Sequence, residues 1–253
     1  MKRVFITGAS SGIGAALATV YAGQGAQLAL VGRRRDALLA LQASLPGTHR
    51  IYQLDVRDRE ALHEAARDFL LDGPVDVVVA SAGISAGTLT EEPDDYRVFE
   101  AIVSTNLNAT VASFEPFIAS MKKRGHGRLV GIASVAAVRG LPGAGAYCAS
   151  KAAVRAYCES LRVELCRSGI QVVTLAPGFI ATPMTARNPY KMPFLMAAPT
   201  FAALAVKAIE RGASYKVIPW QMGVVGKLLA LVPDRIYDHF AVGRKRKPRI
   251  GKA

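Results

Sequence analysis

Cysteine and histidine are scarce in this chain of 253 residues, which contains three Cys and four His. Cys148, Cys158 and Cys166 form an odd set in one predicted helix, so they match neither a disulfide framework nor the paired ligands of a zinc site. The histidines are dispersed along the sequence. The sequence therefore predicts no metal site, and its unpaired thiols are typical of a reducing cytosol.

A long uninterrupted apolar run is also missing. The first residues are basic and then briefly apolar, but a glycine turn that starts at Gly8 interrupts them too soon for a signal peptide. The apolar stretch over residues 217–232 is too short and too broken to span a bilayer. We therefore expect a cytoplasmic protein rather than an exported or membrane-spanning one.

Acidic residues are few: 19 Asp and Glu stand against 32 Lys and Arg, which gives a formal net charge of +13. Much of the excess is local, in residues 33–35 and 244–252. A charge of this size can attract nucleic acid or an anionic membrane. Because the sequence has no recognisable motif that reads nucleic acid, and because much of the charge is terminal, we expect no nucleic-acid partner.

The composition, 51% hydrophobic and 20% charged residues, suits one large α/β domain. Seven short runs rich in Val, Ile and Leu predict buried strands, at residues 4–7, 27–31, 50–54, 75–80, 128–133, 171–176 and 216–218. Stretches with helical spacing lie between them, for example 13–24, 35–44, 59–71 and 146–166. This alternation predicts a Rossmann-like, doubly wound, seven-stranded parallel sheet in a three-layer α/β/α fold, with ligand beyond the carboxyl ends of the strands.

Three glycines connect the first predicted strand to the first predicted helix. At Gly8, Gly12 and Gly14, backbone N–H groups and the helix amino terminus can face a pyrophosphate with no Cβ in the way. The spacing, G-x-x-x-G-x-G, differs from the common dinucleotide fingerprint, but the strand-to-helix context is the required one. The turn therefore predicts a dinucleotide site; the alternative is an ordinary tight turn.

The end of the second predicted strand favours NADP over NAD. Gly32, followed by Arg33, Arg34 and Arg35, stands where an acidic residue would hold the ribose 2′-hydroxyl of NAD. An arginine can instead bind a 2′-phosphate through paired, charge-assisted hydrogen bonds. We expect this role for Arg33 and Arg34, and a solvated helix start for Arg35. Asp55, after the third predicted strand, is placed to accept from the adenine amino group or to cap the next helix.

A tyrosine and a lysine four residues apart predict proton transfer. Tyr147 and Lys151 share one face of their predicted helix. Free tyrosine and lysine have pKa values of about 10 and about 10.4, but a neighbouring ammonium and an oxidised nicotinamide would lower the pKa of the phenol. Tyr147 would then donate a proton to a carbonyl oxygen in reduction and remove one from an alcohol in oxidation. Ser134 ends the fifth predicted strand, where its hydroxyl can bond the substrate oxygen.

Together these residues resemble the short-chain dehydrogenase/reductase family over nearly the whole chain. The matching positions are Thr7-Gly8-x-x-x-Gly12-x-Gly14, Asp55, Ser81-Ala82-Gly83, Asn106, Ser134, Tyr147-Cys148-Ala149-Ser150-Lys151 and Pro177-Gly178 with Thr182. The resemblance implies a single NADP(H)-binding, Rossmann-like catalytic domain over residues 1–243. It also implies a homo-oligomer, either a dimer or a tetramer.

The resemblance further implies roles for individual residues. The implied catalytic set is Asn106, Ser134, Tyr147 and Lys151; Lys151 also holds the nicotinamide ribose, and Asn106 anchors a water behind it. The implied cofactor-binding set is Thr7, Gly8, Ser10, Ser11, Gly12, Ile13, Gly14, Arg33, Arg34, Asp55, Val56, Ser81, Ala82, Gly83, Tyr147, Lys151, Pro177, Gly178, Ile180 and Thr182. Ser81 departs from the Asn that is common in the family, which puts the structural role of that amide in doubt.

Residues 183–199 predict a substrate lid because methionines and aromatic residues alternate there with prolines. Tyr190, Met192, Phe194, Leu195 and Met196 suit an apolar ligand, although an ordinary packed connection could have the same composition. We expect an NADP(H)-dependent enzyme that interconverts a small-molecule ketone and a secondary alcohol, with a hydrophobic, lipid-like or acyl substrate. The alternative is a catalytically silent NADP-binding scaffold or sensor.

The carboxyl-terminal end combines the apolar stretch 217–232 with a basic tail, residues 244–253, that we expect to be flexible. An apolar patch followed by cations can lie on an anionic membrane surface. We therefore consider peripheral contact with a membrane at the cytoplasmic face. The alternative is that the apolar part packs against the sheet or against a second subunit.

Overall fold

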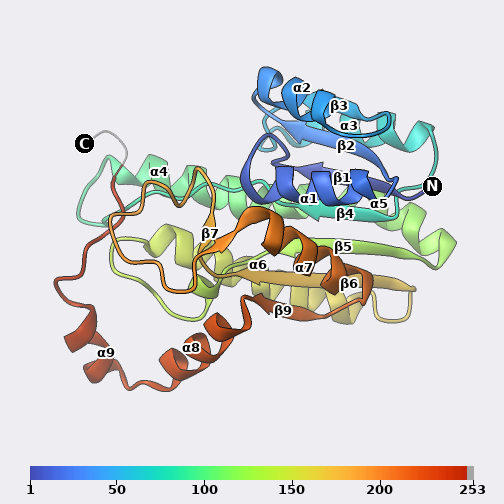
Figure 1. Cartoon of the computed structure of the whole chain (residues 1–253). Helices are drawn as coiled ribbons and strands as arrows, with labels where there is room; N and C mark the ends of the chain where they lie inside the picture. Colours follow the sequence, from blue (N-terminus) through green and yellow to red (C-terminus); the bar gives the residue numbers. More distant parts are fainter. Residues whose placement is uncertain (250–253) are drawn as a thin grey trace.

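One parallel sheet forms the centre of the molecule in a computed structural model that describes residues 1–249 (Figure 1). Its seven strands lie in the order β3-β2-β1-β4-β5-β6-β9. Their bounds are β1 Arg3–Thr7, β2 Gln27–Gly32, β3 Arg50–Gln53, β4 Val77–Ala80, β5 Gly127–Ile132, β6 Ile170–Pro177 and β9 Tyr215–Ile218. The predicted seven-stranded parallel sheet is confirmed.

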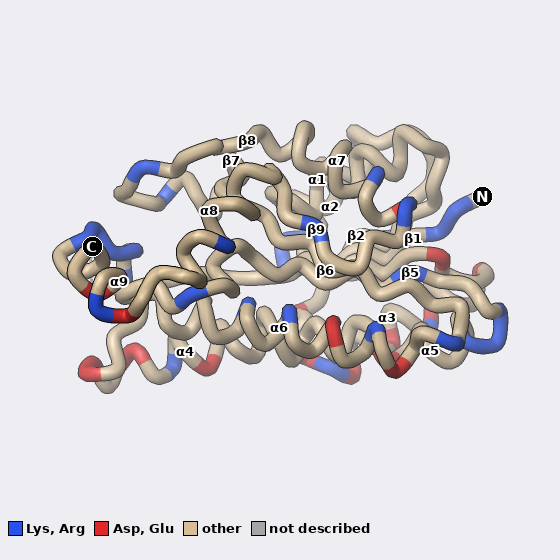
Figure 2. The backbone as a smooth tube through the Cα atoms, turned by 90° about the horizontal axis from the view of Figure 1, so that it is seen from below, with Lys and Arg blue, Asp and Glu red and all other residues tan. Residues whose placement is uncertain are grey.

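Helices cover both faces of the sheet (Figure 2). One face packs against α1 Gly12–Gly23, α2 Arg35–Ser44 and α7 Ala198–Glu210. The other packs against α3 Arg59–Leu71, α5 Ala109–Arg124 and α6 Gly145–Glu164, while α4 Asp95–Val103 continues into α5 through the π-helical turn Ser104–Asn108. The predicted three-layer α/β/α architecture is therefore confirmed.

The first strand illustrates how both layers form. Successive side chains of a strand point to opposite faces of a sheet. Val4 and Ile6 accordingly pack in the cluster that includes α1 and α7, whereas Phe5 packs with α3 and α5. The Phe5 ring lies 5.0 Å from the ring of Phe117. A continuous apolar run is thus what a strand needs when helices cover both of its faces.

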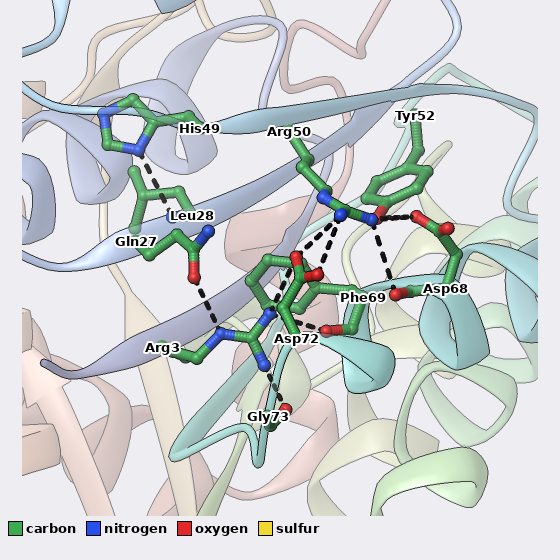
Figure 3. A network of polar contacts seen from close by, with 10 residues as sticks. All are labelled: Arg3, Gln27, Leu28, His49, Arg50, Tyr52, Asp68, Phe69, Asp72 and Gly73. Carbon is green, nitrogen blue, oxygen red and sulfur yellow. Dashed lines mark hydrogen bonds and ion pairs between the residues drawn. The ribbon is translucent and has the colours of Figure 1, made fainter.

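A polar network ties the amino end of β1 to the end of α3 (Figure 3). Arg3 is buried; its Nε donates to Gln27 Oε1 at 2.8 Å, and its Nη2 donates to the Phe69 carbonyl at 2.6 Å. Its Nη1 donates to the Gly73 carbonyl. Because the last carbonyls of a helix lack partners within the helix, Arg3 satisfies the Phe69 carbonyl, which burial would otherwise leave unpaired. The predicted site lies at the opposite, carboxyl edge of the sheet.

The region after β6 contains short elements that the sequence pattern did not predict. β7 Ile180–Ala181 and β8 Met196–Ala197 pair in parallel and form a separate two-stranded sheet at the two ends of the predicted lid. Two-residue strands are too short to show an alternating pattern. After β9 come α8 Trp220–Leu231 and α9 Asp234–Ala241. Within residues 1–249, no helix combines the length and apolar character that crossing a bilayer requires.

The start of the basic tail is bound to the body of the protein, as Figure 1 shows where the chain returns from α9 towards α4. Lys247 Nζ donates to Ser85 Oγ at 2.9 Å. Arg249 pairs with Asp95 at 2.7 Å and with Glu92 at 3.0 Å. These contacts correct the expectation of a flexible tail for Lys247 and Arg249, because buried Asp95 attracts the guanidinium. Residues 250–253, which were part of that expectation, lie outside the described residues.

Candidate active site

A cavity of about 290 Å³ opens beyond the carboxyl ends of the central strands. It lies where the strand order changes direction, next to β1 and β4, as expected for a doubly wound sheet. The residues from the predicted sets that line it are Gly8, Ser10, Ser11, Gly12, Ile13, Gly14, Arg33, Arg34, Asp55, Val56, Ser81, Ala82, Gly83, Ser134, Tyr147, Lys151, Pro177, Gly178, Ile180 and Thr182. Of the predicted residues, Thr7 and Asn106 stand behind this lining.

In the glycine turn, backbone segments approach one another so closely that side chains would not fit between them. Gly8 and Gly12 have φ angles of +68° and +59°, which L-residues with a Cβ rarely adopt. A Cβ on Gly8 would lie 2.7 Å from the Ala82 Cα, and one on Gly14 would lie 2.3 Å from the Gly8 carbonyl oxygen. The amino terminus of α1 therefore faces the cavity without obstruction, and the turn fits the pyrophosphate of a dinucleotide.

Thr7 holds two neighbouring strands together below this turn. Its Oγ1 accepts hydrogen bonds from the backbone N–H groups of Ser81, at 3.2 Å, and Ala82, at 3.3 Å. The same hydroxyl lies 3.5 Å from the Val79 carbonyl oxygen. Thr7 thus fixes the chain after β4 against the end of β1, and Ser81 takes part through its backbone rather than through the amide that an Asn would supply.

Two arginines border the cavity at the carboxyl end of β2. Arg34 Nη2 donates to the Ser10 carbonyl at 3.0 Å, which places this guanidinium against the glycine turn. The Arg33 side chain is 63% exposed, and its Nη1 lies 3.8 Å from Asp55 Oδ2. Both guanidinium groups therefore bring positive charge to the part of the cavity that follows β2.

Asp55 binds an arginine that the sequence interpretation overlooked. Arg57 Nη2 lies 2.6 Å from Asp55 Oδ2, and hydrogen bonds from Arg57 hold the pKa of the Asp55 carboxyl below its usual range. Asp58, not Asp55, caps α3, because its Oδ1 accepts from the Ala61 N–H at 3.1 Å. The capping alternative for Asp55 is therefore wrong, since α3 starts three residues later than that role requires.

The predicted proton-transfer residues converge from two elements. Ser134 follows β5, and its Oγ accepts from the Ala136 N–H at 3.1 Å, which orients the hydroxyl. Tyr147 and Lys151 lie in the first half of α6, and the Lys151 Nζ lies 5.9 Å from the centre of the Tyr147 ring. Lys151 donates to the Ile132 carbonyl at 2.7 Å, so the end of β5 positions the ammonium.

Burial has the largest effect on the pKa values of Tyr147 and Lys151. It raises the pKa of the Tyr147 phenol, although a hydrogen bond with Ser134 opposes the rise. Burial also lowers the pKa of Lys151 to about 8. The lowered tyrosine pKa expected from a neighbouring ammonium is thus not found in the chain by itself, because desolvation of a phenolate outweighs its favourable contacts.

Asn106 is fully buried behind the cavity, in the π-helical turn between α4 and α5. Its Oδ1 accepts from the Ile84 N–H at 2.8 Å, and its Nδ2 donates to the Ile84 carbonyl at 3.1 Å and to Ser150 Oγ at 2.9 Å. The side chain therefore links the loop after β4 to the helix that carries Tyr147 and Lys151. These contacts suit Asn106 to hold α6 in position, and its place in the catalytic set stays a prediction.

Residues of the predicted lid lie at two separate cavities. Met184 lines the first cavity, and Tyr190 lies near enough to Tyr147 to raise the pKa of its phenol further. Phe194, Leu195 and Met196 instead line a second groove of about 760 Å³, between α7, β9 and Trp220. The five apolar side chains expected around one ligand are thus not all at one site, because the pairing of β7 with β8 turns the second half of the lid away.

Thr185 was missing from the predicted set, although it fixes the end of the first cavity. Its Oγ1 accepts from the Thr182 N–H at 3.0 Å and donates to the Ile180 carbonyl at 2.5 Å. Thr185 follows Thr182 by three positions, and Ser and Thr often bond to nearby backbone in turns. This spacing is the sequence signal that could have identified Thr185.

Comparisons with known proteins agree with this geometry. A family model described as short chain dehydrogenase matches residues 2–192. An uncharacterized oxidoreductase of Myxococcus xanthus is 36% identical over 241 residues, which cover 94% of this chain and 95% of the relative. The 2-dehydro-3-deoxy-L-rhamnonate dehydrogenase (NAD(+)) of a Sphingomonas species is 35% identical over 189 residues, 74% of this chain and 76% of the relative. The crystal structure of levodione reductase superposes with a TM-score of 0.80 at 26% identity, over 88% of this chain and 98% of that one.

Proposed function

Because the chain belongs to the short chain dehydrogenase family, we propose that this oxidoreductase uses NADP(H) to interconvert a ketone and a secondary alcohol. The observation that carries the proposal is the convergence of Ser134, Tyr147 and Lys151 on the cavity that also contains the glycine turn. One cavity thereby combines groups suited to a dinucleotide with groups suited to moving a proton.

The preference for NADP(H) rests on charge at the end of β2. Arg33 and Arg34 both line the cavity there, and Gly32 occupies the end of the strand, so no carboxylate at that position repels a 2′-phosphate. Asp55 does lie nearby, but its closest partner is Arg57, at 2.6 Å. The name of the Sphingomonas relative includes NAD(+), so membership of the family leaves the choice of nucleotide to such local residues.

The chain's own residues account for proton transfer. A nicotinamide cofactor held by the glycine turn and Lys151 would supply or accept the hydride. Tyr147, whose protonated form burial favours, donates its phenolic proton to the substrate oxygen in reduction. In oxidation the Tyr147 phenolate takes the proton from the alcohol and becomes the phenol. Ser134 holds the same oxygen through its hydroxyl, and the Lys151 ammonium stabilises the phenolate that forms when Tyr147 gives up its proton. Asn106 keeps α6 aligned through Ser150.

Apolar groups around the reacting residues favour a hydrophobic ketone, lipid-like or acyl in character. Ile84 and Met184 line the cavity, and the Tyr190 ring packs edge to face with Phe179, 6.4 Å away. Such side chains remove an apolar substrate from water while a few polar groups orient its carbonyl. Activity with NADPH over a series of methyl ketones of increasing chain length tests this substrate class, and we expect kcat/KM to rise with chain length.

Replacement of Tyr147 by Phe tests the chemistry. The variant keeps the ring but loses the proton donor, so turnover of NADPH with any accepted ketone should fall at least about 100-fold. The Kd for NADPH, measured by fluorescence titration, should change less than about twofold, because nucleotide binding does not need the phenol. Retained turnover would remove Tyr147 from the role of proton donor. If the unaltered protein binds NADPH but converts no ketone, the alternative, a catalytically silent NADP-binding scaffold or sensor, is favoured instead.

A further inference from the structure

Helix α8 packs on the body of the protein through one side only. Its buried residues are Met222 and Gly226. A Cβ on Gly178 would lie 2.7 Å from the Met222 Cγ, and one on Gly226 would lie 3.4 Å from Val138 Cγ2. Gly178 lines the first cavity, and Val138 follows Ser134 by four residues. The inner side of α8 therefore borders the candidate active site.

The outer side of α8 is apolar and exposed. Trp220, Val224, Leu228 and Leu231 all project into solvent, and helical geometry places them within about 80° of one another. Ile236 and Phe240, one turn apart on α9, are exposed as well. We call these six residues the apolar stripe. Single exposed apolar residues are ordinary, but several along one side of a helix mark a surface that contacts something else.

The apolar stripe is held in place by Arg139. Its Nη1 donates to the carbonyls of Leu229, at 2.7 Å, and Val232, at 2.5 Å, at the end of α8. Its Nη2 pairs with Asp234 at 2.7 Å, at the start of α9. The side chain thus joins both helices to the loop that follows Ser134. A surface fixed in this way loses little conformational freedom when it binds.

Positive charge surrounds the apolar stripe. Residues 215–249 contain eight Lys and Arg but only two Asp and Glu, and α8 contains no acidic residue. Lys227 is exposed on the same side of α8, between Val224 and Leu228 in the sequence. Arg235, Arg244 and Lys245 are exposed on and after α9, where Figure 2 shows basic segments gathered at this end of the molecule.

We propose that the apolar stripe and its surrounding cations dock this protein on an anionic membrane surface. Helices that lie in a lipid interface combine an exposed apolar face containing Trp, Phe or Leu with Lys and Arg beside it. Neither helix is long and apolar enough to cross a bilayer, so contact with lipid would be made through their exposed sides. Since the inner side of α8 borders the cavity, docking holds the cavity next to the lipid. The proposal goes beyond the oxidoreductase activity and does not require it.

Trp220 provides a direct probe, because it is the single tryptophan of the chain and its side chain is 68% exposed. The full-length protein should float with vesicles of phosphatidylcholine and phosphatidylserine, and its tryptophan emission should shift to shorter wavelength as the indole enters the lipid. Vesicles of phosphatidylcholine alone should bind far less protein, because they present no net negative charge. Absence of flotation and of the emission shift with the anionic vesicles would overturn the proposal.

Two exposed leucines test whether the apolar stripe, rather than the protein surface in general, binds the vesicles. Leu231 is 79% exposed on the apolar stripe, and Leu71 is 83% exposed at the end of α3, far from it. Leu231→Asp should weaken binding to the anionic vesicles about tenfold or more, whereas Leu71→Asp should leave it unchanged. Leu228→Asp serves as a second variant if Leu231→Asp fails to fold, as judged by thermal unfolding. Equal losses for Leu231→Asp and Leu71→Asp would contradict the proposal.

Charge reversal at two matched pairs of basic residues tests the electrostatic part of the membrane-docking proposal. Arg244→Glu with Lys245→Glu should weaken binding by about 25-fold or more, since each basic residue near the lipid contributes roughly fivefold. Lys122→Glu with Lys123→Glu, at the end of α5, changes the net charge equally and should have only a small effect. Similar losses for both pairs would mean that overall charge, not this face, drives binding.

A second copy of the chain is the competing occupant of the apolar stripe. In that case sedimentation velocity without vesicles would show self-association that Leu231→Asp abolishes and Leu71→Asp does not. The Trp220 emission would then shift with protein concentration alone. That result, together with loss of vesicle binding in the associated form, would assign the face to a protein interface and overturn membrane docking.

Discussion

Arg33 and Arg34 are neighbours in the sequence, but their guanidinium groups have different partners. Arg34 is bonded to Ser10 of the glycine turn, whereas Arg33 is largely exposed and makes one long ion pair with Asp55. Arg33 can therefore turn to a phosphate without giving up a strong interaction. Arg34 already lies against the turn, where it contributes positive charge from a fixed position.

Replacement of Arg33 by Ala should raise the Kd for NADPH roughly 10- to 100-fold, the range expected when charge-assisted hydrogen bonds to a phosphate are lost. The Kd for NADH should change less than about twofold, because NADH has no 2′-phosphate. Isothermal titration calorimetry with both nucleotides measures the two effects. Arg35→Ala is the matched control: it removes the same charge from an exposed residue that does not line the cavity. Equal losses in the two variants would show that Arg33 acts only through long-range charge.

Lys151 should set the alkaline limb of the reaction. Burial brings its pKa down to about 8, whereas burial raises the pKa of Tyr147. As the pH rises through about 8, Lys151 loses its proton first and Tyr147 stays a phenol. The ammonium that stabilises the developing phenolate is then gone, although the proton donor is still present.

The kcat/KM for ketone reduction should therefore be constant below about pH 8 and fall above it, approaching roughly tenfold per pH unit. Initial rates in a constant-ionic-strength buffer series measure the profile. Ser134→Ala should lower the whole curve without moving its bend, because Ser134 binds substrate oxygen and does not titrate. A profile that stays flat up to the ordinary pKa of lysine, about 10.4, would exclude Lys151 as the titrating group.

Strand β1 and helix α3 are joined at the amino edge of the sheet by Arg3 rather than by apolar packing alone. The guanidinium lies 4.0 Å from the centre of the Phe69 ring and bonds to the carbonyls of Phe69 and Gly73. Arg50 extends the contact by pairing with Asp68 at 2.6 Å and with Asp72 at 2.8 Å. The end of α3 is thus held by charged groups that lie at the edge opposite to the cavity (Figure 3).

Arg3→Ala should lower the free energy of unfolding by about 3 kcal/mol, because it leaves the buried Phe69 carbonyl near the end of α3 without its donor and removes the bond to the half-buried Gly73 carbonyl. Urea unfolding measures this change. Arg67→Ala, on the same helix, removes an exposed ion pair with Glu60 and should change stability by less than about 0.5 kcal/mol. The Kd for NADPH should be the same in both variants; a weaker Kd in Arg3→Ala would mean that the amino edge also shapes the cavity.

Residues from the middle of the chain hold the carboxyl-terminal elements in place. Arg249 reaches Glu92 and Asp95 at the start of α4, while Arg139 holds α8 and α9. These arginines fasten the last described residues around the side of the molecule that bears the cavity. They add polar contacts to the packing of Met222 and Gly226, which already holds α8 on the body of the protein.

Across the whole molecule, polar groups collect at the two edges of the sheet and apolar groups fill its faces. The carboxyl edge carries the glycine turn, Ser134, Tyr147 and Lys151, and the amino edge carries the network around Arg3. This separation lets residues at one edge change binding while residues at the other change stability. It also explains why the fold could be predicted closely: continuous apolar runs are required of strands that helices cover on both faces.

The lid and the tail could not be predicted with the same success. β7 and β8 form through two backbone pairs between segments more than a dozen residues apart, which no local pattern records. Lys247 and Arg249 looked like part of a solvated basic run until the fold brought Ser85, Glu92 and Asp95 beside them. Thr185 was overlooked because its partners are local but its importance depends on the cavity that it lines. Arg57 was overlooked because it matters only through Asp55, its ion-pair partner, which lines that cavity.

The order of strands and helices, the glycine turn and the spacing of Tyr147 and Lys151 are written in the sequence, because each depends on periodicity or on residues a few positions apart. Only the tertiary structure decided which long-range partners meet. Burial raises the pKa of Tyr147 despite the nearby ammonium, and α8 turns one side to the cavity and the other to solvent. Desolvation and exposure are properties of the packed chain, so no reading of adjacent residues can supply them.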